Sequence, residues 1–244
     1  MSPMKPRRLQ LGSLQCVVFG GPDGDGRGTG PVIVLCHGFG APGEDLVSFG
    51  EVLRLPSDVR WVFPAAPLEL EMGYGGDSRA WWMIDMARLD RELRAGRGAS
   101  LTKDEPDGLP AARDALLSVL AAIPDALGAP SKLILGGFSQ GAMLSCDVAL
   151  STAVPLAGLV LLSGTVVGEP RWRAAARTGA RKGLPVFQSH GTYDPVLPFA
   201  GAELLRDLLI EGGASVKFTR FDGQHEIPPP ALRDLQKFLV ERIG

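Results

Sequence analysis

Lys132-Leu133-Ile134-Leu135-Gly136-Gly137-Phe138-Ser139-Gln140-Gly141 is an apolar run that ends in Gly-x-Ser-x-Gly and leads into Ala142-Met143-Leu144. The pattern predicts a strand, a sharp turn with Ser139 at its apex, and a helix. In such a turn the serine hydroxyl projects from the edge of the sheet. A side chain at Gly137 or Gly141 would collide where strand and helix nearly touch. Ser139 is therefore the candidate nucleophile.

The base that would activate Ser139 must be one of three histidines, His37, His190 and His225. Where a serine sits on this kind of turn, the acid follows it along the chain and the histidine follows the acid. His37 precedes the serine and His190 precedes the best acid, so only His225 remains. It comes just after the strand-like residues 216–220, where a loop at the carboxyl end of a parallel strand would carry it.

The same chain order selects the acid. Residues 185–191 form another strand-like run, and Asp194 lies three residues beyond its last glycine. Asp222 is the rival acid, but it is so close in sequence to His225 that we expect it to form a turn. Asp194 is therefore the predicted partner of His225.

Attack by Ser139 would place negative charge on a carbonyl oxygen, and backbone amides can stabilise that charge. One amide should come from Gln140, at the start of a helix whose dipole favours negative charge. The second should come from His37-Gly38-Phe39-Gly40, which follows an early strand and resembles the His-Gly loops of lipases and esterases. Phe39 is the predicted second donor.

Apolar runs and helical patterns alternate along the rest of the chain. The runs in the middle of the chain are continuous in Val, Ile and Leu, as strands buried on both faces should be. A mostly parallel sheet covered by amphipathic helices is therefore expected, and a chain of 244 residues without a long linker should form one α/β domain, 1–244. The expected strands are 32–36, 59–63, 133–136, 159–162, 186–189 and 216–221, with an antiparallel strand at 15–19, and the expected helices are 111–123, 200–211 and 231–243.

Charge and cysteine content restrict the function classes. The 25 basic and 27 acidic residues nearly balance, so there is no electrostatic reason to expect nucleic acid or an anionic membrane as a partner. The three cysteines cannot all pair, and we interpret them as buried thiols of a reducing compartment. The first residues are basic without a following apolar stretch, and no run has membrane-spanning length, so a cytoplasmic location is expected.

No cofactor and no metal site is predicted. The Gly- and Asp-rich residues 20–30 precede a strand instead of following one, and Arg27 and Val34 stand where a calcium loop needs ligands. His225-Glu226 could begin a zinc-binding helix, but the prolines at 228–230 forbid that helix and no second histidine follows. Residues 20–30 are therefore interpreted as a turn.

Seven motifs occur in the order seen in one protein family. They are Val34-Leu35-Cys36-His37-Gly38-Phe39-Gly40, Phe63-Pro64-Ala65-Ala66-Pro67, Arg79-Ala80-Trp81-Trp82, Gly136-Gly137-Phe138-Ser139-Gln140-Gly141-Ala142, Leu161-Leu162-Ser163-Gly164, Ser189-His190-Gly191-Thr192-Tyr193-Asp194-Pro195-Val196-Leu197-Pro198 and Gly223-Gln224-His225-Glu226-Ile227. From about Val32 to the C-terminus the chain resembles the carboxylesterase and acyl-protein thioesterase (phospholipase/carboxylesterase) family of α/β-hydrolases. The resemblance implies an α/β-hydrolase fold, with a mostly parallel central sheet and helices on both faces.

The resemblance also implies residue roles. Ser139, Asp194 and His225 would form the catalytic triad, and the Phe39 and Gln140 amides would form the oxyanion hole. Trp81 would lie near the acyl pocket. Family members that act on lipidated proteins often carry Trp-Phe-Asp after this tryptophan, whereas here Trp81-Trp82-Met83-Ile84-Asp85 precedes a longer insert. In this respect the chain resembles the bacterial esterase branch.

The insert, residues 83–110, carries apolar residues at helical spacing with arginines between them. Such an amphipathic piece beside the tryptophans could be a lid over the acyl pocket, and a plain surface helix is the alternative. Trp81, Trp82 and Met83 are the predicted substrate-binding residues. Because large rigid side chains near the nucleophile shorten a pocket, short to medium acyl chains are the expected substrates.

The sequence thus predicts a serine carboxylesterase that acts through an acyl-enzyme intermediate. Thioester and lysophospholipid hydrolysis are the neighbouring alternatives, since both leaving groups fit the same machinery. A non-catalytic binding protein with a hydrolase fold is the alternative from another class. The expected partner is a small-molecule ester, with a second copy of the chain as an option and no integral membrane association.

Overall fold

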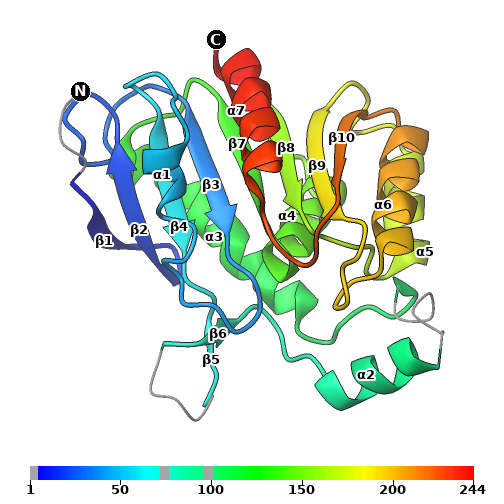
Figure 1. Ribbon diagram of the computed structural model, residues 1–244. Helices are drawn as coiled ribbons and strands as arrows, with labels where there is room; N and C mark the ends of the chain where they lie inside the picture. Colours follow the sequence, from blue (N-terminus) through cyan, green and yellow to red (C-terminus); the bar gives the residue numbers. More distant parts are fainter. Residues whose placement is uncertain (1–4, 72–76, 96–101) are drawn as a thin grey trace.

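An eight-stranded sheet forms the centre of the protein in the computed structural model, which describes residues 5–71, 77–95 and 102–244 (Figure 1). Its strand order is β1-β2-β4-β3-β7-β8-β9-β10, and all strands from β4 to β10 in that order run parallel. The first two strands are antiparallel additions at one edge. The strands are β1 (Arg7–Leu11), β2 (Leu14–Gly20), β3 (Val32–Cys36), β4 (Arg60–Pro64), β7 (Leu133–Phe138), β8 (Gly158–Leu162), β9 (Pro185–Gly191) and β10 (Ser215–Phe221).

Continuous apolar sequence produces the strands at the centre of this sheet. Every residue of β3, β4 and β8 is buried, as expected for strands covered on both faces. The mostly parallel sheet predicted from these runs is confirmed. Strand β1 was not predicted, because its residues are mainly basic or polar and only Leu11 is fully buried.

Helices cover both faces of the sheet (Figure 1). The core divides accordingly into two clusters, one beneath α1 and α7 and the other beneath α3, α4, α5 and α6. The helices on the sheet are α1 (Phe49–Val52), α3 (Leu109–Leu127), α4 (Gln140–Ser151), α5 (Glu169–Arg177), α6 (Phe199–Glu211) and α7 (Pro229–Ile243). The three helices predicted from their apolar stripes correspond to α3, α6 and α7, each of which begins one or two residues earlier than predicted. α3 also ends four residues later, whereas α6 and α7 end as predicted.

Two small elements lie beyond the carboxyl edge of the sheet, below it in Figure 1. β5 (Leu68–Glu69) and β6 (Arg79–Ala80) pair as a two-stranded ribbon, and α2 (Met86–Arg94) follows within the predicted insert. Most of α2 is exposed to solvent. Residues 96–101 of the insert lie outside the described residues.

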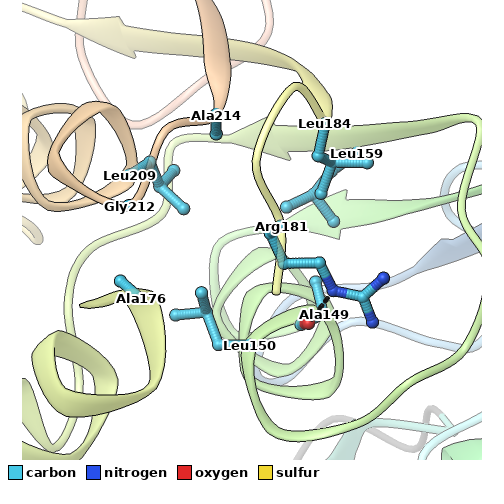
Figure 2. A pocket seen from close by; sticks show the side chains of 9 residues that line it. All are labelled: Ala149, Leu150, Leu159, Ala176, Arg181, Leu184, Leu209, Gly212 and Ala214. Atoms are coloured by element: carbon cyan, nitrogen blue, oxygen red, sulfur yellow. Dashed lines mark hydrogen bonds between the residues drawn. The ribbon is translucent and has the colours of Figure 1, made fainter. Parts of the chain in front are cut away.

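The helix that begins at the candidate nucleophile is fixed at its other end by a half-buried arginine. The Arg181 guanidinium donates hydrogen bonds to the carbonyls of Ala149, Thr152 and Val154, where α4 ends. Figure 2 shows this side chain beside a void of about 10 Å³, lined by apolar side chains of α4, α5 and α6. A void of that size admits no substrate, so this region anchors α4.

None of the helices in the described ranges combines the length and the apolar composition needed to cross a membrane.

Candidate active site

Ser139 lies between β7 and α4 in a backbone conformation that few residues other than glycine adopt. Its φ is +53° and its ψ is −116°, and its N–H donates to the Leu162 carbonyl of the neighbouring strand at 2.8 Å. Such strain persists only where the surrounding structure enforces it. The predicted turn with the serine at its apex is therefore present.

Two glycines make this turn sterically possible. A Cβ atom at Gly141 would lie 2.1 Å from the carbonyl oxygen of Cys36, and one at Gly137 would lie 2.4 Å from the same oxygen. Both distances are far shorter than a non-bonded contact allows, and the obstructing atom belongs to the backbone of β3. As predicted, glycine is thus required at positions 137 and 141, because α4 approaches the strands closely.

Three side chains from the ends of three parallel strands form a continuous hydrogen-bonded line. The Ser139 Oγ lies 2.9 Å from His225 Nε2, and His225 Nδ1 lies 2.6 Å from Asp194 Oδ2. An ionised carboxylate only accepts hydrogen bonds, so Nδ1 carries the proton and Nε2 is free to accept one from the serine. The imidazole also packs on Phe138, with 4.9 Å between ring centroids.

The Asp194 carboxylate is buried and receives four hydrogen-bond donors. Oδ1 accepts from the N–H groups of Val196 and Leu197 at 2.8 Å each, and Oδ2 accepts from His225. His190 Nε2 is the fourth donor: it lies 3.2 Å from Oδ2 and shares its N–H with the closer Leu197 carbonyl, at 2.8 Å. Burial alone would raise the pKa of Asp194. The hydrogen bonds from the two imidazoles and from Leu197 outweigh it and hold that pKa well below its usual range. The carboxylate therefore stays ionised and keeps the His225 ring in one tautomer.

The rival acid Asp222 and the first histidine, His37, have partners outside this line. The Asp222 carboxylate accepts a hydrogen bond from the Thr192 hydroxyl at 3.4 Å and lies at the surface. His37 accepts the Ala66 N–H at Nε2, and burial lowers its pKa to about 4. Its Nδ1 lies 2.8 Å from the Gly38 carbonyl. His37 is thus a neutral structural residue.

The two predicted oxyanion donors lie in the loop after β3 and at the first residue of α4. Neither the Phe39 amide nor the Gln140 amide has a hydrogen-bond acceptor among the residues that the structure describes. Gln140 opens a helix of twelve residues, so its N–H also lies at the positive end of the helix dipole. Both amides are available to an oxygen of a bound substrate.

A cavity of about 700 Å³ lies between α2, α4, α6 and the loops after β8 and β9. Met143, one turn along α4 from Ser139, forms part of its wall, as do Trp82 and Leu197. Arg88 and Asp104 pair at its polar rim. Over the described residues, no group of three or more His, Cys, Asp or Glu side chains is arranged to hold a metal ion. The cavity thus has an apolar wall close to the candidate nucleophile.

The structure separates the three predicted substrate-binding residues. Trp82 and Met83 line the cavity, whereas Trp81 does not and is only 1% exposed. The Trp81 indole N–H donates to the His37 carbonyl at 3.0 Å, and the ring packs on the His37 imidazole. Trp81 therefore lies beneath the loop that carries Phe39.

The sequence analysis assigned no role at the site to two residues that lie there. His190 Nε2 lies 3.2 Å from the Asp194 carboxylate, and Ser163 donates from its hydroxyl to the Glu226 carbonyl at 3.2 Å, next to His225. Ser163 has a φ of +49°, in the region that favours glycine. Ser163 and Glu226 are distant in sequence, so no local pattern could reveal their contact. The i, i+4 spacing of His190 and Asp194 was the only available signal.

A model of the phospholipase/carboxylesterase family matches residues 26–243. The chain belongs to this family of α/β-hydrolases. It is an enzyme of the carboxylesterase and thioesterase type of serine hydrolases, and the family and fold predicted from its motifs are confirmed.

Individual relatives give the same result. Acyl-protein thioesterase 1 of Eremothecium gossypii is 30% identical over 217 residues, which cover 86% of this chain and 87% of the relative. The crystal structure of esterase PE8 superposes with a TM-score of 0.77 at 27% identity, covering 95% of this chain and 99% of the other. A carboxylesterase from Mesorhizobium loti shares the fold, with a TM-score of 0.71, 17% identity and coverages of 96% and 98%.

Proposed function

We propose that this enzyme cleaves carboxylic esters of short to medium acyl chains with Ser139 as nucleophile, His225 as base and Asp194 as the orienting acid. The observation that carries the proposal is the unbroken line of hydrogen bonds from Ser139 through His225 to Asp194, at 2.9 and 2.6 Å. These distances are within the range over which a base can take a proton from a nucleophile.

In the acylation step, the Ser139 oxygen attacks the acyl carbonyl carbon while its proton passes to His225 Nε2. The imidazolium that forms is stabilised by Asp194, which is held ionised by its four donors. The proton then moves from His225 to the leaving alcohol as the carbon–oxygen bond breaks. Ser139 is left as an acyl ester.

Deacylation repeats these steps with water. His225 takes a proton from the water as it attacks the acyl-enzyme, and returns it to the Ser139 oxygen as the acid departs. In both steps the carbonyl oxygen becomes negatively charged, and the amides of Phe39 and Gln140 would donate to it. Removal of one such donor costs about 3 to 4 kcal/mol of transition-state stabilisation in related chemistry.

The acyl chain would lie in the cavity beside Met143, with Trp82 and Met83 at its wall. The volume of about 700 Å³ lies within the range of sites that hold drug-sized ligands. The cavity is larger than a short acyl chain needs. The longest acyl chain that the enzyme accepts would therefore depend on how far the Trp82 and Met83 side chains narrow the cavity.

Hydrolysis of longer acyl thioesters is the second candidate. It is favoured by the same cavity volume and by the relatives that are named acyl-protein thioesterase 1. The Ser139, His225 and Asp194 chemistry is the same for either leaving group. The two candidates therefore differ only in the chain length and leaving group that give the highest kcat/KM.

A substrate panel tests both candidates. Aryl esters from acetate to palmitate would be compared with acyl thioesters and a lysophospholipid, with Ser139→Ala as the blank. We expect kcat/KM to peak at short to medium acyl esters, and Trp82→Ala to move the peak toward longer chains. A value that rises steadily to palmitoyl thioesters would instead establish the second candidate, and no turnover of any substrate would reject both.

We further propose a single domain in a reducing compartment such as the cytoplasm. All three cysteines are buried and unpaired, and burial raises the pKa of the Cys16 thiol to about 12. Such thiols are poorly placed to form disulfides. Titration of three free thiols after denaturation of the native protein, and one cooperative unfolding transition, are the expected results. Dimer formation stays a prediction that sedimentation measurements can check.

A further inference from the structure

Residues 79–82, here called the crossing segment, run from β6 to the cavity wall between the two predicted oxyanion donors. On one side the crossing segment pairs with the loop that carries Phe39. The Gly40 N–H donates to the Arg79 carbonyl at 2.8 Å, and the Arg79 N–H donates to the Ala41 carbonyl at 3.1 Å. These two bonds hold the end of the loop against β6.

On its other side the crossing segment is bound by the side chain of Gln140. The Gln140 Oε1 accepts the Trp81 N–H at 2.9 Å, and its Nε2 donates to the Trp82 carbonyl at 2.8 Å. From the same segment the Trp81 indole N–H donates to the His37 carbonyl at 3.0 Å. The residue after the nucleophile is thus connected to the loop of Phe39 through its own carboxamide.

The burial of Gln140 makes these contacts costly to lose. Its side chain is fully buried, and both ends of the amide group are hydrogen-bonded to backbone atoms of the crossing segment. A buried amide without partners is strongly unfavourable, so the carboxamide and the segment fix each other in one arrangement. The distance between the Phe39 and Gln140 amides then depends on this arrangement.

We propose that the Gln140 side chain is a positioning residue that sets the spacing of the two oxyanion-hole amides through the crossing segment. The inference rests on the proposed function, in which those amides stabilise the oxyanion. Gln140 would therefore act twice, through its backbone N–H on the substrate oxygen and through its carboxamide on the placement of the second donor.

A purely local role in the acyl pocket makes a different prediction. Because Trp82 lines the cavity, loss of the Gln140 carboxamide could merely disturb the acyl-binding wall. KM would then rise, and the loss would grow with acyl chain length. Misplaced oxyanion donors would instead lower kcat by the same factor for acetate and octanoate esters, since both share one carbonyl group.

The test compares Gln140→Met with Gln188→Met. Both glutamines are fully buried, but the Gln188 amide donates to the Ala202 carbonyl at the side of α6, away from the triad. We expect Gln140→Met to lower kcat about 10- to 100-fold, as misplacement by about 1 Å does, with KM within about threefold. Affinity for a trifluoromethyl ketone, whose hemiketal on Ser139 places an oxyanion between the donors, should fall by the same factor as kcat/KM. Gln188→Met should keep wild-type kcat.

Two further measurements test whether the Gln140 side chain holds the crossing segment and the loop of Phe39 in place. Trp81→Phe removes the indole donor, together with part of the ring volume, and should lower kcat at least about three- to tenfold, the value of one neutral hydrogen bond. Hydrogen exchange of the peptide spanning 37–41 should become faster in Gln140→Met and not in Gln188→Met. Faster exchange with kcat within twofold of wild type would overturn the inference, as would a loss confined to KM. A wild-type enzyme that turns over esters without being labelled at Ser139 would instead overturn the proposed function, and this inference with it.

Discussion

The turn around Ser139 and the insert that follows the tryptophans lie on the same edge of the sheet but are built in opposite ways. Every α4 residue from Gln140 to Leu150 is buried. Around the turn, backbone atoms lie within 2.5 Å of the place that a Cβ would occupy at Gly137 or Gly141, so the turn has no room to change. The insert, by contrast, is exposed to solvent. Met83, just before α2, is 64% exposed, and Met86, the first residue of α2, is 51% exposed.

The attachment of α2 is correspondingly light. Asp85 accepts the Arg88 N–H at the start of the helix, and Arg88 pairs with Asp104 across the cavity rim, with both side chains at least half exposed. An exposed ion pair of this kind contributes little to stability. On the proposed function, the chemistry would therefore depend on rigid backbone geometry around Ser139, whereas substrate preference would depend on a peripheral element that can vary at little cost to the fold.

The largest loss of activity should follow substitutions in the proposed triad, which lies in the rigid region around Ser139. His225→Ala and Asp194→Ala are each expected to lower kcat about 10⁴-fold or more, and His225→Ala combined with Ser139→Ala should be no worse than either alone. The reason is that, in the proposed mechanism, the three groups would act as one proton-transfer unit. Steady-state kinetics of the folded variants check this. A retained kcat in His225→Ala with a loss in His190→Ala would reverse the assignment.

A methyl group at the turn tests whether sterics alone fix it. Gly141→Ala would place a Cβ 2.1 Å from the Cys36 carbonyl oxygen, so β3 or α4 must shift. We expect the free energy of unfolding to fall by about 3 kcal/mol, with most activity lost. Gly179→Ala is the matched control, because no atom lies within 4 Å of its Cβ and only its φ of +71° is unfavourable. Equal urea midpoints for the two variants would contradict the steric account.

His37, which belongs to the rigid region, is buried. We therefore expect the stability of the protein to depend on pH. Burial lowers the pKa of His37 from 6.5 to about 4. Between these values the unfolded chain binds the proton and the folded chain does not, so the free energy of unfolding falls as the pH is lowered from 6.5 to 4. The contribution is about 3 kcal/mol. This fall in the free energy of unfolding should be absent in His37→Gln, as urea unfolding at pH 7 and 4.5 would reveal. If the free energy of unfolding of His37→Gln fell between these pH values as much as that of the wild type, the explanation would be wrong.

The smallest effect on stability is expected in the insert. Arg88→Ala breaks the exposed pair with Asp104 and should leave the urea midpoint unchanged. Because Arg88 lines the cavity, the same change should alter KM for octanoate esters more than for acetate esters. A marked fall in the urea midpoint would show that the insert is as firmly built as the turn.

The sequence predicted the parts of the protein that local sterics and burial dictate. Gly-x-Ser-x-Gly marks Ser139 because only glycine fits beside the turn, and continuous apolar runs mark β3 and β8 because both faces are covered. Chain order then separated His225 from the two other histidines. The hydrogen bonds of His225 to Ser139 and Asp194 agree with that choice.

What escaped prediction depends on contacts between distant segments. Trp81 and Trp82 are adjacent and identical in type, yet Trp82 lines the cavity and Trp81 supports the His37 carbonyl. The backbone of both is hydrogen-bonded by the Gln140 carboxamide, which lies 58 or more positions further along the chain. No local pattern distinguishes them, and the same holds for the contact of Ser163 with Glu226.

The mass of the intact protein after reaction with a fluorophosphonate would reveal whether Ser139 is the nucleophile. The Ser139 oxygen would bond to phosphorus as fluoride leaves, with the proton passing to His225. We predict that the wild-type protein gains one equivalent of label at Ser139, that His225→Ala reacts far more slowly, and that Ser139→Ala gains none. Uptake of one equivalent by Ser139→Ala at the wild-type rate would contradict the account.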